Sequence, residues 1–233
     1  MLSIIIPTLN EEKCLPKLLD CINSQTYKDY EIIVTDANSK DKTTRIAKKY
    51  GCRIVRRGGL PGISRNKGAK AAKGDILLFL DADSAIVPNF LEEALEKIKK
   101  RKLGVAGCYL RPSSNKIIDK IFLGIFNSWI FLTQYFYPNA CGAGIFCKKW
   151  LHDKINGFDK SIKLSEDMDY VRRAGKLGKF GILRNPKVIF SMRRYDNEGR
   201  FNVVFKLLLS AFYRVFFGEI RNDIFNYNLK YKK

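Results

Sequence analysis

Two aspartates, Asp81 and Asp83, follow an apolar run over residues 76–80. In an extended chain, side chains i and i+2 project to the same side, so both carboxylates can face one divalent cation. Carboxylate oxygens suit Mg²⁺ or Mn²⁺, which keep coordination positions open for substrate phosphates. The pair therefore predicts a metal site that receives a phosphate-bearing substrate. Alternatively, Asp83 and Ser84 only turn the chain and cap a helix that begins near Pro88.

The elements that would position these carboxylates alternate along the N-terminal half. Apolar runs at 2–6, 31–35, 53–55 and 76–80 alternate with helical patterns at 15–22, 43–50 and 91–98. This alternation indicates a Rossmann-like α/β sheet with mostly parallel strands. Such sheets bind ligands beyond the carboxyl ends of their strands, and Asn10, Asp36 and Asp81 all fall just past predicted strand ends.

The composition is strongly basic, with 43 Lys and Arg against 23 Asp and Glu and a net charge of +20. This excess indicates a polyanionic partner, either nucleic acid or an anionic membrane. Zinc-finger spacing, an RNP-type aromatic motif and a low-complexity basic tail are missing from the sequence, so we expect a membrane and no nucleic acid. The six cysteines form no CxxC pair and are expected to be reduced core residues. The first predicted strand follows Met1 without a basic leader, so we expect a cytoplasmic protein.

An aromatic, almost wholly apolar segment lies at residues 116–137. On a helix its polar residues fall within roughly 40° of one another. These residues are Lys116, Lys120, Asn127 and Gln134. Its uncharged part is shorter than the ~20 residues that a membrane span needs, so we interpret it as an interfacial helix in the membrane surface. A buried core helix, a protein interface and contact with another subunit in a homo-oligomer are alternatives.

A second amphipathic segment, at 201–217, surrounds a stripe that contains Lys206, Ser210 and Arg214. The chain then ends in a basic stretch with Lys230, Lys232 and Lys233. Positive charge near an anionic leaflet contributes about 1 kcal/mol per basic residue. Residues 201–233 are therefore predicted to form a basic, amphipathic segment that associates with the cytoplasmic face of a membrane.

Several motifs, taken in order, resemble those of family 2 glycosyltransferases. They are IIIPTLNEE at 4–12, EIIVTDANSKDKT at 31–43, SRNKG at 64–68, DAD at 81–83, GFD at 157–159 and SEDMD at 165–169. The resemblance implies a GT-A fold over residues 1–200, a nucleotide-sugar donor, a divalent metal and inversion at the anomeric carbon. Leu9 and Ala37 depart from the family pattern. No QxxRW motif is present, which favours a single transfer over polymer synthesis.

The resemblance implies a donor site at the strand ends. Its residues would be Pro7, Thr8, Asn10, Glu11, Asp36, Asn38, Arg65, Asp81, Ala82, Asp83, Arg193 and Arg194. Asp36 would accept a hydrogen bond from the nucleotide base, although an Asx-turn with Asn38 and Ser39 is an alternative. Asp81 would face the ribose or a metal-bound water, and Asp83 would bind Mn²⁺ or Mg²⁺. UDP is favoured over GDP because such enzymes use it more often.

The arginines and the later acidic motif have both chemical and structural interpretations. Arg193 and Arg194 would clamp the diphosphate, or form a solvated basic turn. Arg65 would contact phosphate, or belong to a charged surface face. Asp167, with Glu166 beside it on the acceptor side, would be the general base, or both would only favour the dipole of a helix first turn. The lone His152 receives no role.

Two other functions remain open on the sequence alone. A sugar nucleotidyltransferase also uses a nucleotide-binding α/β sheet and acidic metal ligands, but it is expected to carry a glycine-rich loop after its first strand, where this chain has Pro7-Thr8-Leu9-Asn10. The other is a non-catalytic protein that binds membrane or nucleic acid on a degenerate transferase fold. The leading hypothesis is a transferase that moves one sugar to a hydroxyl or phosphate of a lipid-linked or membrane-adjacent acceptor.

Overall fold

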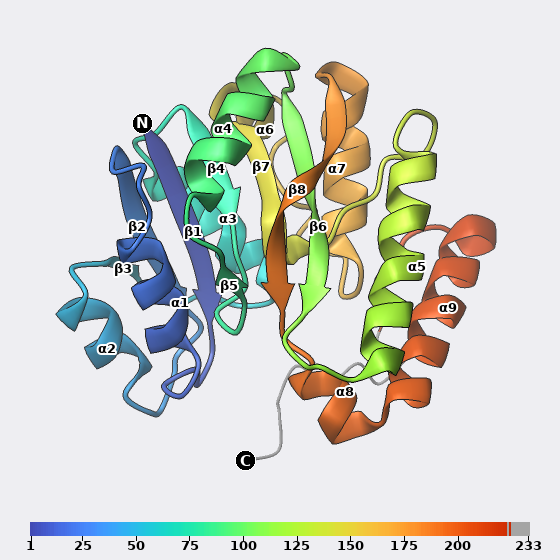
Figure 1. The fold of residues 1–233 in the computed structure, drawn as a ribbon, viewed down its shortest axis with the longest axis horizontal. Helices are drawn as coiled ribbons and strands as arrows, with labels where there is room; N and C mark the ends of the chain where they lie inside the picture. Colours follow the sequence, from blue (N-terminus) through green and yellow to red (C-terminus); the bar gives the residue numbers. More distant parts are fainter. Residues whose placement is uncertain (223, 225–233) are drawn as a thin grey trace.

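A computed structural model describes residues 1–222 and 224, in which eight strands form one curled, mixed sheet (Figure 1). The strand order is β3-β2-β1-β4-β7-β6-β8-β5. The strands are β1 (Leu2–Thr8), β2 (Tyr30–Asp36), β3 (Arg53–Val55), β4 (Ile76–Phe79), β5 (Ala85–Ile86), β6 (Val105–Pro112), β7 (Ile145–Lys148) and β8 (Phe180–Phe190). Lys230, Lys232 and Lys233, on which the predicted basic end depends, lie outside the described residues.

The first part of the sheet is parallel and the second part is mixed. Strands β3, β2, β1 and β4 pair in parallel, as the alternating pattern predicts. Strand β7 is antiparallel to both β4 and β6, whereas β6 and β8 are parallel. Four strand pairs are thus parallel and three antiparallel. The prediction of a mostly parallel α/β sheet is confirmed.

Helices cover both faces of this sheet (Figure 1). They are α1 (Leu15–Asn23), α2 (Thr43–Lys49), α3 (Pro61–Ala71), α4 (Phe90–Lys100), α5 (Ile117–Thr133), α6 (Lys149–Lys154), α7 (Glu166–Leu177), α8 (Arg193–Glu198) and α9 (Arg200–Phe217), with a 3₁₀ turn at Gly142–Gly144. Along β1, Ile4 and Ile6 enter one apolar cluster and Ile5 enters another. Side chains alternate across a strand, so an all-apolar strand is buried on both faces, as parallel sheets require.

The two apolar segments that the sequence singles out are helices, α5 and α9. Helix α5 packs along β6, and α9 follows the short α8 at the same end of the molecule (Figure 1). None of the described helices combines the length and the apolar composition that crossing a membrane requires.

Candidate functional site

The carboxyl ends of β1 and β2 lie side by side, since Thr8 pairs with Asp36 in the parallel register. The Asp36 carboxylate is buried; it accepts a hydrogen bond from the Ser39 backbone N–H at 3.0 Å and one from the Thr8 hydroxyl at 3.4 Å. The Asx-turn considered as an alternative is therefore present. One oxygen holds the turn and the other faces β1, so the same carboxylate can still meet a ligand at this edge.

Two asparagines shape the loops that follow β1 and β2. Asn10 and Asn38 adopt positive φ angles of 56° and 65°, which asparagine tolerates better than most residues. The Asn10 side-chain oxygen accepts the Lys40 N–H at 2.8 Å, and the Asn10 N–H donates to the Ser39 hydroxyl at 2.9 Å. The two loops are thus tied together beside Asp36.

Asp81 and Asp83 each bind a different arginine. Asp81 pairs with Arg65 at 2.8 Å, and Asp83 pairs with Arg193 at 3.2 Å. Burial raises the pKa of Asp83, the nearby charge of Asp81 raises it further, and Arg193 opposes both. Ala82, between them, is buried.

These carboxylates suit a divalent cation. Among the described residues, no group of three or more His, Cys, Asp and Glu side chains could hold a metal ion by itself. Mg²⁺ and similar hard cations are commonly held by one or two carboxylates plus substrate phosphates and water. Since Asp81 and Asp83 disfavour each other's charge, a cation between them would stabilise both. The donor set therefore fits a metal that binds together with a diphosphate.

Arg65 lies at the centre of the acidic residues. Its side chain is only 4% exposed and donates to Glu166 at 2.6 Å as well as to Asp81. The alternative of a charged surface face is therefore wrong. Glycine is required at Gly142, because a Cβ there would lie 2.3 Å from Nη2 of Arg65.

Arg193, which begins α8, crosses to the loop after β1. Its guanidinium donates two hydrogen bonds to Glu11, at 3.0 and 2.7 Å, and thereby joins the start of α8 to the loop after β1. Burial raises the pKa of Glu11, and Arg193 opposes this increase. Arg194 is mostly buried and lies 3.7 Å from Glu198. The alternative of a solvated basic turn is wrong.

Asp167 lies in the first turn of α7, where a carboxylate also suits the helix dipole. Its two oxygens accept hydrogen bonds from the backbone N–H groups of Gly142 at 2.7 Å and Met168 at 2.9 Å. Burial raises the pKa of Asp167, whereas Arg65 and these N–H groups oppose the rise. Burial likewise raises the pKa of the neighbouring Glu166. The N–H groups fix the carboxylate's orientation, as a general base needs.

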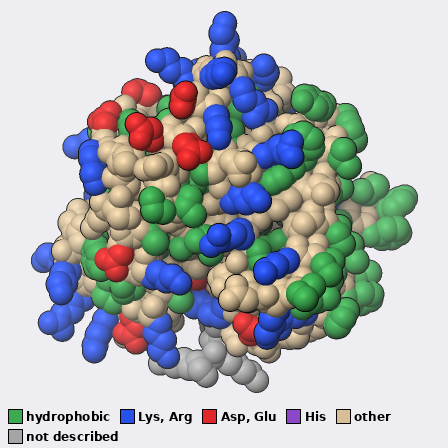
Figure 2. All heavy atoms as spheres, in the orientation of Figure 1, with side chains coloured by type: hydrophobic (Ala, Val, Ile, Leu, Met, Phe, Trp, Pro, Cys, Tyr) green, Lys and Arg blue, Asp and Glu red, His purple; other side chains and the backbone are tan. Residues whose placement is uncertain are grey.

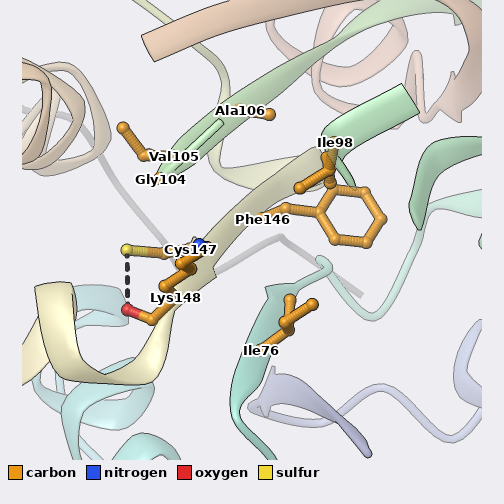
Figure 3. A pocket seen from close by; sticks show the side chains of 8 residues that line it. All are labelled: Ile76, Ile98, Gly104, Val105, Ala106, Phe146, Cys147 and Lys148. Carbon is orange, nitrogen blue, oxygen red and sulfur yellow. Dashed lines mark hydrogen bonds between the residues drawn. The ribbon is translucent and has the colours of Figure 1, made fainter. Parts of the chain in front are cut away.

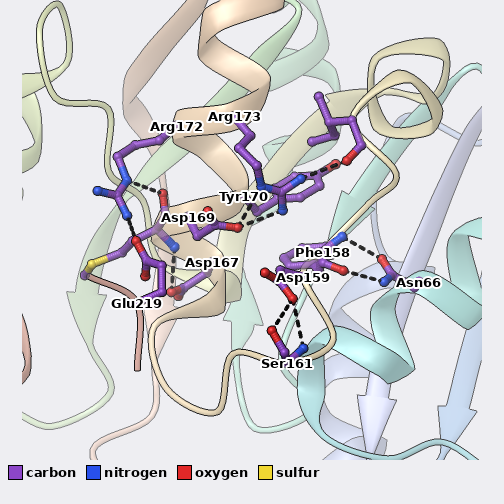
Figure 4. A network of polar contacts seen from close by, with 12 residues as sticks. Asn66, Phe158, Asp159, Ser161, Asp167, Asp169, Tyr170, Arg172, Arg173 and Glu219 are labelled. Carbon is purple, nitrogen blue, oxygen red and sulfur yellow. Dashed lines mark hydrogen bonds and ion pairs between the residues drawn. The ribbon is translucent and has the colours of Figure 1, made fainter. Parts of the chain in front are cut away.

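A polar network supports this turn of α7 (Figure 4). Arg173 pairs with Asp169 one helical turn away, and Arg172 pairs with Glu219 after α9. Asn66 on α3 bonds to the backbone N–H and C=O of Phe158, both at 2.8 Å. These contacts tie the loop before α7 to α3, and tie α7 itself to the segment after α9.

The sequence interpretation missed two features of the site region. Gly142 supplies an N–H to Asp167 and leaves space for Arg65; the closely spaced Gly142 and Gly144 were the available signal. His152 is buried and its Nδ1 lies 2.9 Å from the Tyr170 hydroxyl, so it has a structural partner.

A separate small pocket is lined by parts of β4, β6 and β7 (Figure 3). Its lining residues are Ile76, Ile98, Gly104, Val105, Ala106, Phe146, Cys147 and Lys148. None of them belongs to the carboxylate and arginine cluster. The pocket is a gap in the packing between these strands.

Relatives of this chain include named glycosyltransferases. An uncharacterised glycosyltransferase of Haemophilus influenzae is 30% identical over 189 residues, which are 73% of this chain and 60% of that protein. A dolichyl N-acetyl-α-D-glucosaminyl phosphate 3-β-D-2,3-diacetamido-2,3-dideoxy-β-D-glucuronosyltransferase of Methanococcus voltae is 27% identical, over 82% of this chain and 66% of that protein. The chain spans 57% and 60% of the length of its Rickettsia typhi and H. influenzae relatives.

Solved structures share the fold. TarS residues 1–349 of S. aureus superpose with a TM-score of 0.69 at 22% identity, covering 89% of this chain and 64% of that one. The mannosyltransferase PcManGT of Pyrobaculum calidifontis gives a TM-score of 0.73 at 19% identity, covering 90% and 61%. Both show the same GT-A-like architecture. The family model described as "Glycosyl transferase family 2" matches residues 3–151, and the chain therefore belongs to this family.

Proposed function

We propose that the protein is a metal-dependent, inverting glycosyltransferase that moves one sugar from a nucleoside-diphosphate sugar to a lipid-linked or membrane-adjacent acceptor. The observation that carries this proposal is that Asp36, Asp81 and Asp83 lie at or just past the ends of parallel strands at one edge of the sheet. There Arg65 pairs with Asp81, Arg193 pairs with Asp83, and Asp167 accepts the N–H of Gly142 beside Arg65. Acids for a metal, cations for phosphate and a separate oriented carboxylate are what such a transfer needs.

The names of similar proteins support the substrate classes. TarS structures contain UDP and UDP-GlcNAc, and the PcManGT structure contains GDP-Man and Mn²⁺. A Campylobacter jejuni relative, 32% identical over 133 residues, is named a GalNAc(5)-diNAcBac-PP-undecaprenol β-1,3-glucosyltransferase. We favour UDP over GDP for the donor and a hydroxyl or phosphate of a lipid-linked molecule for the acceptor.

The donor would bind across the ends of β1, β2 and β4. Asp36 would accept a hydrogen bond from the base, with the nucleoside against Pro7, Thr8, Asn10, Glu11 and Asn38. Asp83 and Asp81 would hold Mn²⁺ or Mg²⁺, which neutralises charge on the departing diphosphate. Arg193 and Arg194 would add positive charge on the same side, and Arg65 would balance the acids beneath it.

The acceptor would approach Asp167, with Glu166 fixed behind it by Arg65. Asp167 would take the proton of an acceptor hydroxyl as that oxygen bonds to the anomeric carbon. The bond to the diphosphate breaks with its electron pair on the leaving oxygen, and the single displacement inverts the carbon. Asp167 is ready for this task because two backbone N–H groups hold its oxygens.

Residues 1–200 would form the catalytic part, including α5, and residues 201–233 would associate with a membrane. We place the protein at the cytoplasmic face as a peripheral protein. This placement is supported by the net charge of +20 and by the exposed apolar side chains of α5 and α9.

A thermal-shift screen of UDP, GDP and their sugar conjugates, with and without Mn²⁺, tests the proposal, since a ligand that binds the native state raises its melting temperature. We expect Mn²⁺-dependent stabilisation by one nucleotide class, and loss of the Mn²⁺ dependence in Asp83→Ala. Asp75→Ala, which removes a 93% exposed aspartate before the same strand, is the matched control. Equal stabilisation with and without Mn²⁺, or in Asp83→Ala, would remove the metal assignment. UTP and GTP are screened alongside, and stabilisation by these triphosphates alone would favour a nucleotidyltransferase.

A further inference from the structure

Two polar residues, Asn127 of α5 and Gln134 just after it, point into the protein. Asn127 is buried, and its amide bonds both the backbone N–H and C=O of Leu110, at 2.9 and 2.8 Å. Gln134, also buried, accepts the N–H of Ile182 at 3.1 Å. Backbone groups of β6 and β8 beneath the helix are satisfied by these side chains. The broad apolar side of α5 is therefore left facing outward.

Helix α9 has the same inverted arrangement. Arg214 is buried and pairs with Glu219 at 2.9 Å, Ser210 is buried, and Lys206 bonds to Glu198 at 3.0 Å. The helix thus directs its charged side chains toward the protein. A surface helix in water normally exposes its polar side and buries its apolar side, so the arrangement of α9 is reversed.

The outer sides of α5 and α9 adjoin each other, and we call them together the α5–α9 face. Asp119 and Arg200 form an ion pair at 2.7 Å between the helix starts, where Phe122 and Phe201 also meet with ring centroids 6.1 Å apart. The face includes Ile121, Ile125, Leu132, Phe205, Leu208 and Phe212, which are 49–69% exposed. Hydrophobic side chains gather on this side of the molecule (Figure 2). Extended apolar surface of this kind marks an interaction site.

We propose that the α5–α9 face lies in the headgroup region of an anionic lipid bilayer. The positive charge of the chain favours an anionic bilayer over a second copy of the chain at this face. The chain carries +20, and the exposed Lys116, Lys120 and Arg184 belong to α5 or contact it, Arg184 through the ring of Phe131. A second copy of the chain would bring the same positive charge, whereas an anionic leaflet supplies the opposite charge.

This placement also explains how a lipid-linked acceptor reaches the site, a step that rests on the proposed function. Arg214 of α9 contacts the sulfur of Met168 at 2.9 Å, and Met168 follows Asp167 in the chain. The inner side of the lipid-binding helix therefore touches the turn that carries the candidate base. A sugar or phosphate at the membrane surface would reach Asp167 past this contact on the inner side of α9.

Co-sedimentation with vesicles tests the proposal, using phosphatidylcholine vesicles with and without phosphatidylglycerol. The wild-type chain should bind the anionic vesicles and lose binding as salt increases. Leu208→Ser with Phe212→Ser should weaken the partition coefficient by at least about tenfold, because each removes a large apolar side chain from the bilayer. Trp150→Ser with Leu177→Ser removes two side chains that are 52% and 49% exposed elsewhere, and should change binding by less than about twofold.

Absence of wild-type binding to anionic vesicles would overturn the proposal, as would equal losses in both double variants. A wild-type dimer in sedimentation velocity that only the α9 variant dissociates, without vesicle binding, would assign the face to a second copy and also overturn it. Vesicle binding is measured without nucleotide, and donor stabilisation without lipid. Loss of the first with retention of the second therefore refutes the lipid-binding surface alone, and the reverse refutes the transferase alone.

Discussion

Replacing Arg65 with leucine should destabilise the protein strongly. Arg65 is 3% exposed and lies 2.6 Å from Glu166 and 2.8 Å from Asp81. The substitution leaves Glu166 buried without a cation, and removing one partner of a buried ion pair costs roughly 3–5 kcal/mol. Asp81 adds little to this loss, because its side chain is 33% exposed and water replaces the arginine.

The loss should depend on pH. Burial already raises the pKa of Glu166, and removal of Arg65 raises it further. A folded-state pKa above the unfolded value of about 4.3 means that no stability is lost below that pH, and that stability decreases as the pH rises through the folded pKa. The destabilisation of Arg65→Leu should therefore be larger at about pH 8 than at about pH 5. Urea unfolding followed by circular dichroism measures it at both.

Two further variants complete this test. Arg65→Leu combined with Glu166→Gln removes the buried charge and should recover part of the lost stability, mainly at the higher pH. Arg56→Leu, at an exposed position, is the matched control and should change the free energy of unfolding by less than about 0.5 kcal/mol. A loss from Arg65→Leu below about 1 kcal/mol, or one that is equal at both pH values, would refute the argument that Arg65 neutralises a buried Glu166.

Asp167→Asn should lower sugar transfer by roughly 10²–10⁴-fold, in a product assay, while nucleotide thermal shifts stay unchanged; near-normal transfer would exclude it as the base. Gly142→Ala places a Cβ 2.3 Å from Arg65 Nη2 and should cost about 1–3 kcal/mol in urea unfolding. Gly124→Ala, inside α5 with no neighbour within 4 Å, should instead stabilise the protein by roughly 0.5–1 kcal/mol. Burial lowers the pKa of His152 from 6.5 to about 4. The stability that the neutral, buried imidazole contributes is therefore fully present above pH 6.5 and is lost as the pH falls toward 4. His152→Gln should therefore reduce the acid-dependent loss of stability between those values by roughly 3 kcal/mol, and an unchanged pH profile would contradict this assignment.

The sheet could be predicted because its strands are buried on both faces. Runs such as residues 2–6 and 76–80 are almost wholly apolar, and this composition indicates a buried strand whichever side chains pack against it. The carboxyl edge followed from the same pattern, so Asp36 and Asp81 could be assigned to one end of the sheet. Long apolar helices at α5 and α9 were likewise visible from their composition.

The partners of the arginines could not be predicted, because they come from distant parts of the chain. Arg65 and Glu166 are 101 residues apart, and Arg193 and Glu11 are 182 apart. Local sequence around Arg65 is basic and lacks a strong apolar period, so it resembles a surface helix. Its burial arises only when α7 and the turn at Gly142 close over it. Such contacts depend on how distant segments are arranged in the fold, and the hydrophobic periodicity of a local segment contains no information about that arrangement.

The sequence also could not predict which side of α5 faces the protein. Periodicity shows that its polar residues share one side, but it does not say whether water or the protein faces them. The answer depends on unpaired backbone groups at Leu110 and Ile182, which Asn127 and Gln134 satisfy. A buried backbone polar group without a partner costs about 1–3 kcal/mol, so these pairings turn the polar side inward.

The family match ends at residue 151, and this boundary separates the two halves of the candidate site. Asp36, Asp81 and Asp83 lie within the match, whereas Asp167, Arg193 and all of α9 come after it. The part shared with the family thus carries the groups proposed for the base and the metal, whereas Arg193 and Arg194, proposed for the diphosphate, lie beyond it. The groups assigned to the acceptor lie on a segment that the match does not cover, and this segment is held to the first by Arg193 with Glu11 and by Arg65 with Glu166. The geometry of the proposed site therefore depends on those two ion pairs, which hold the later segment against the matched part.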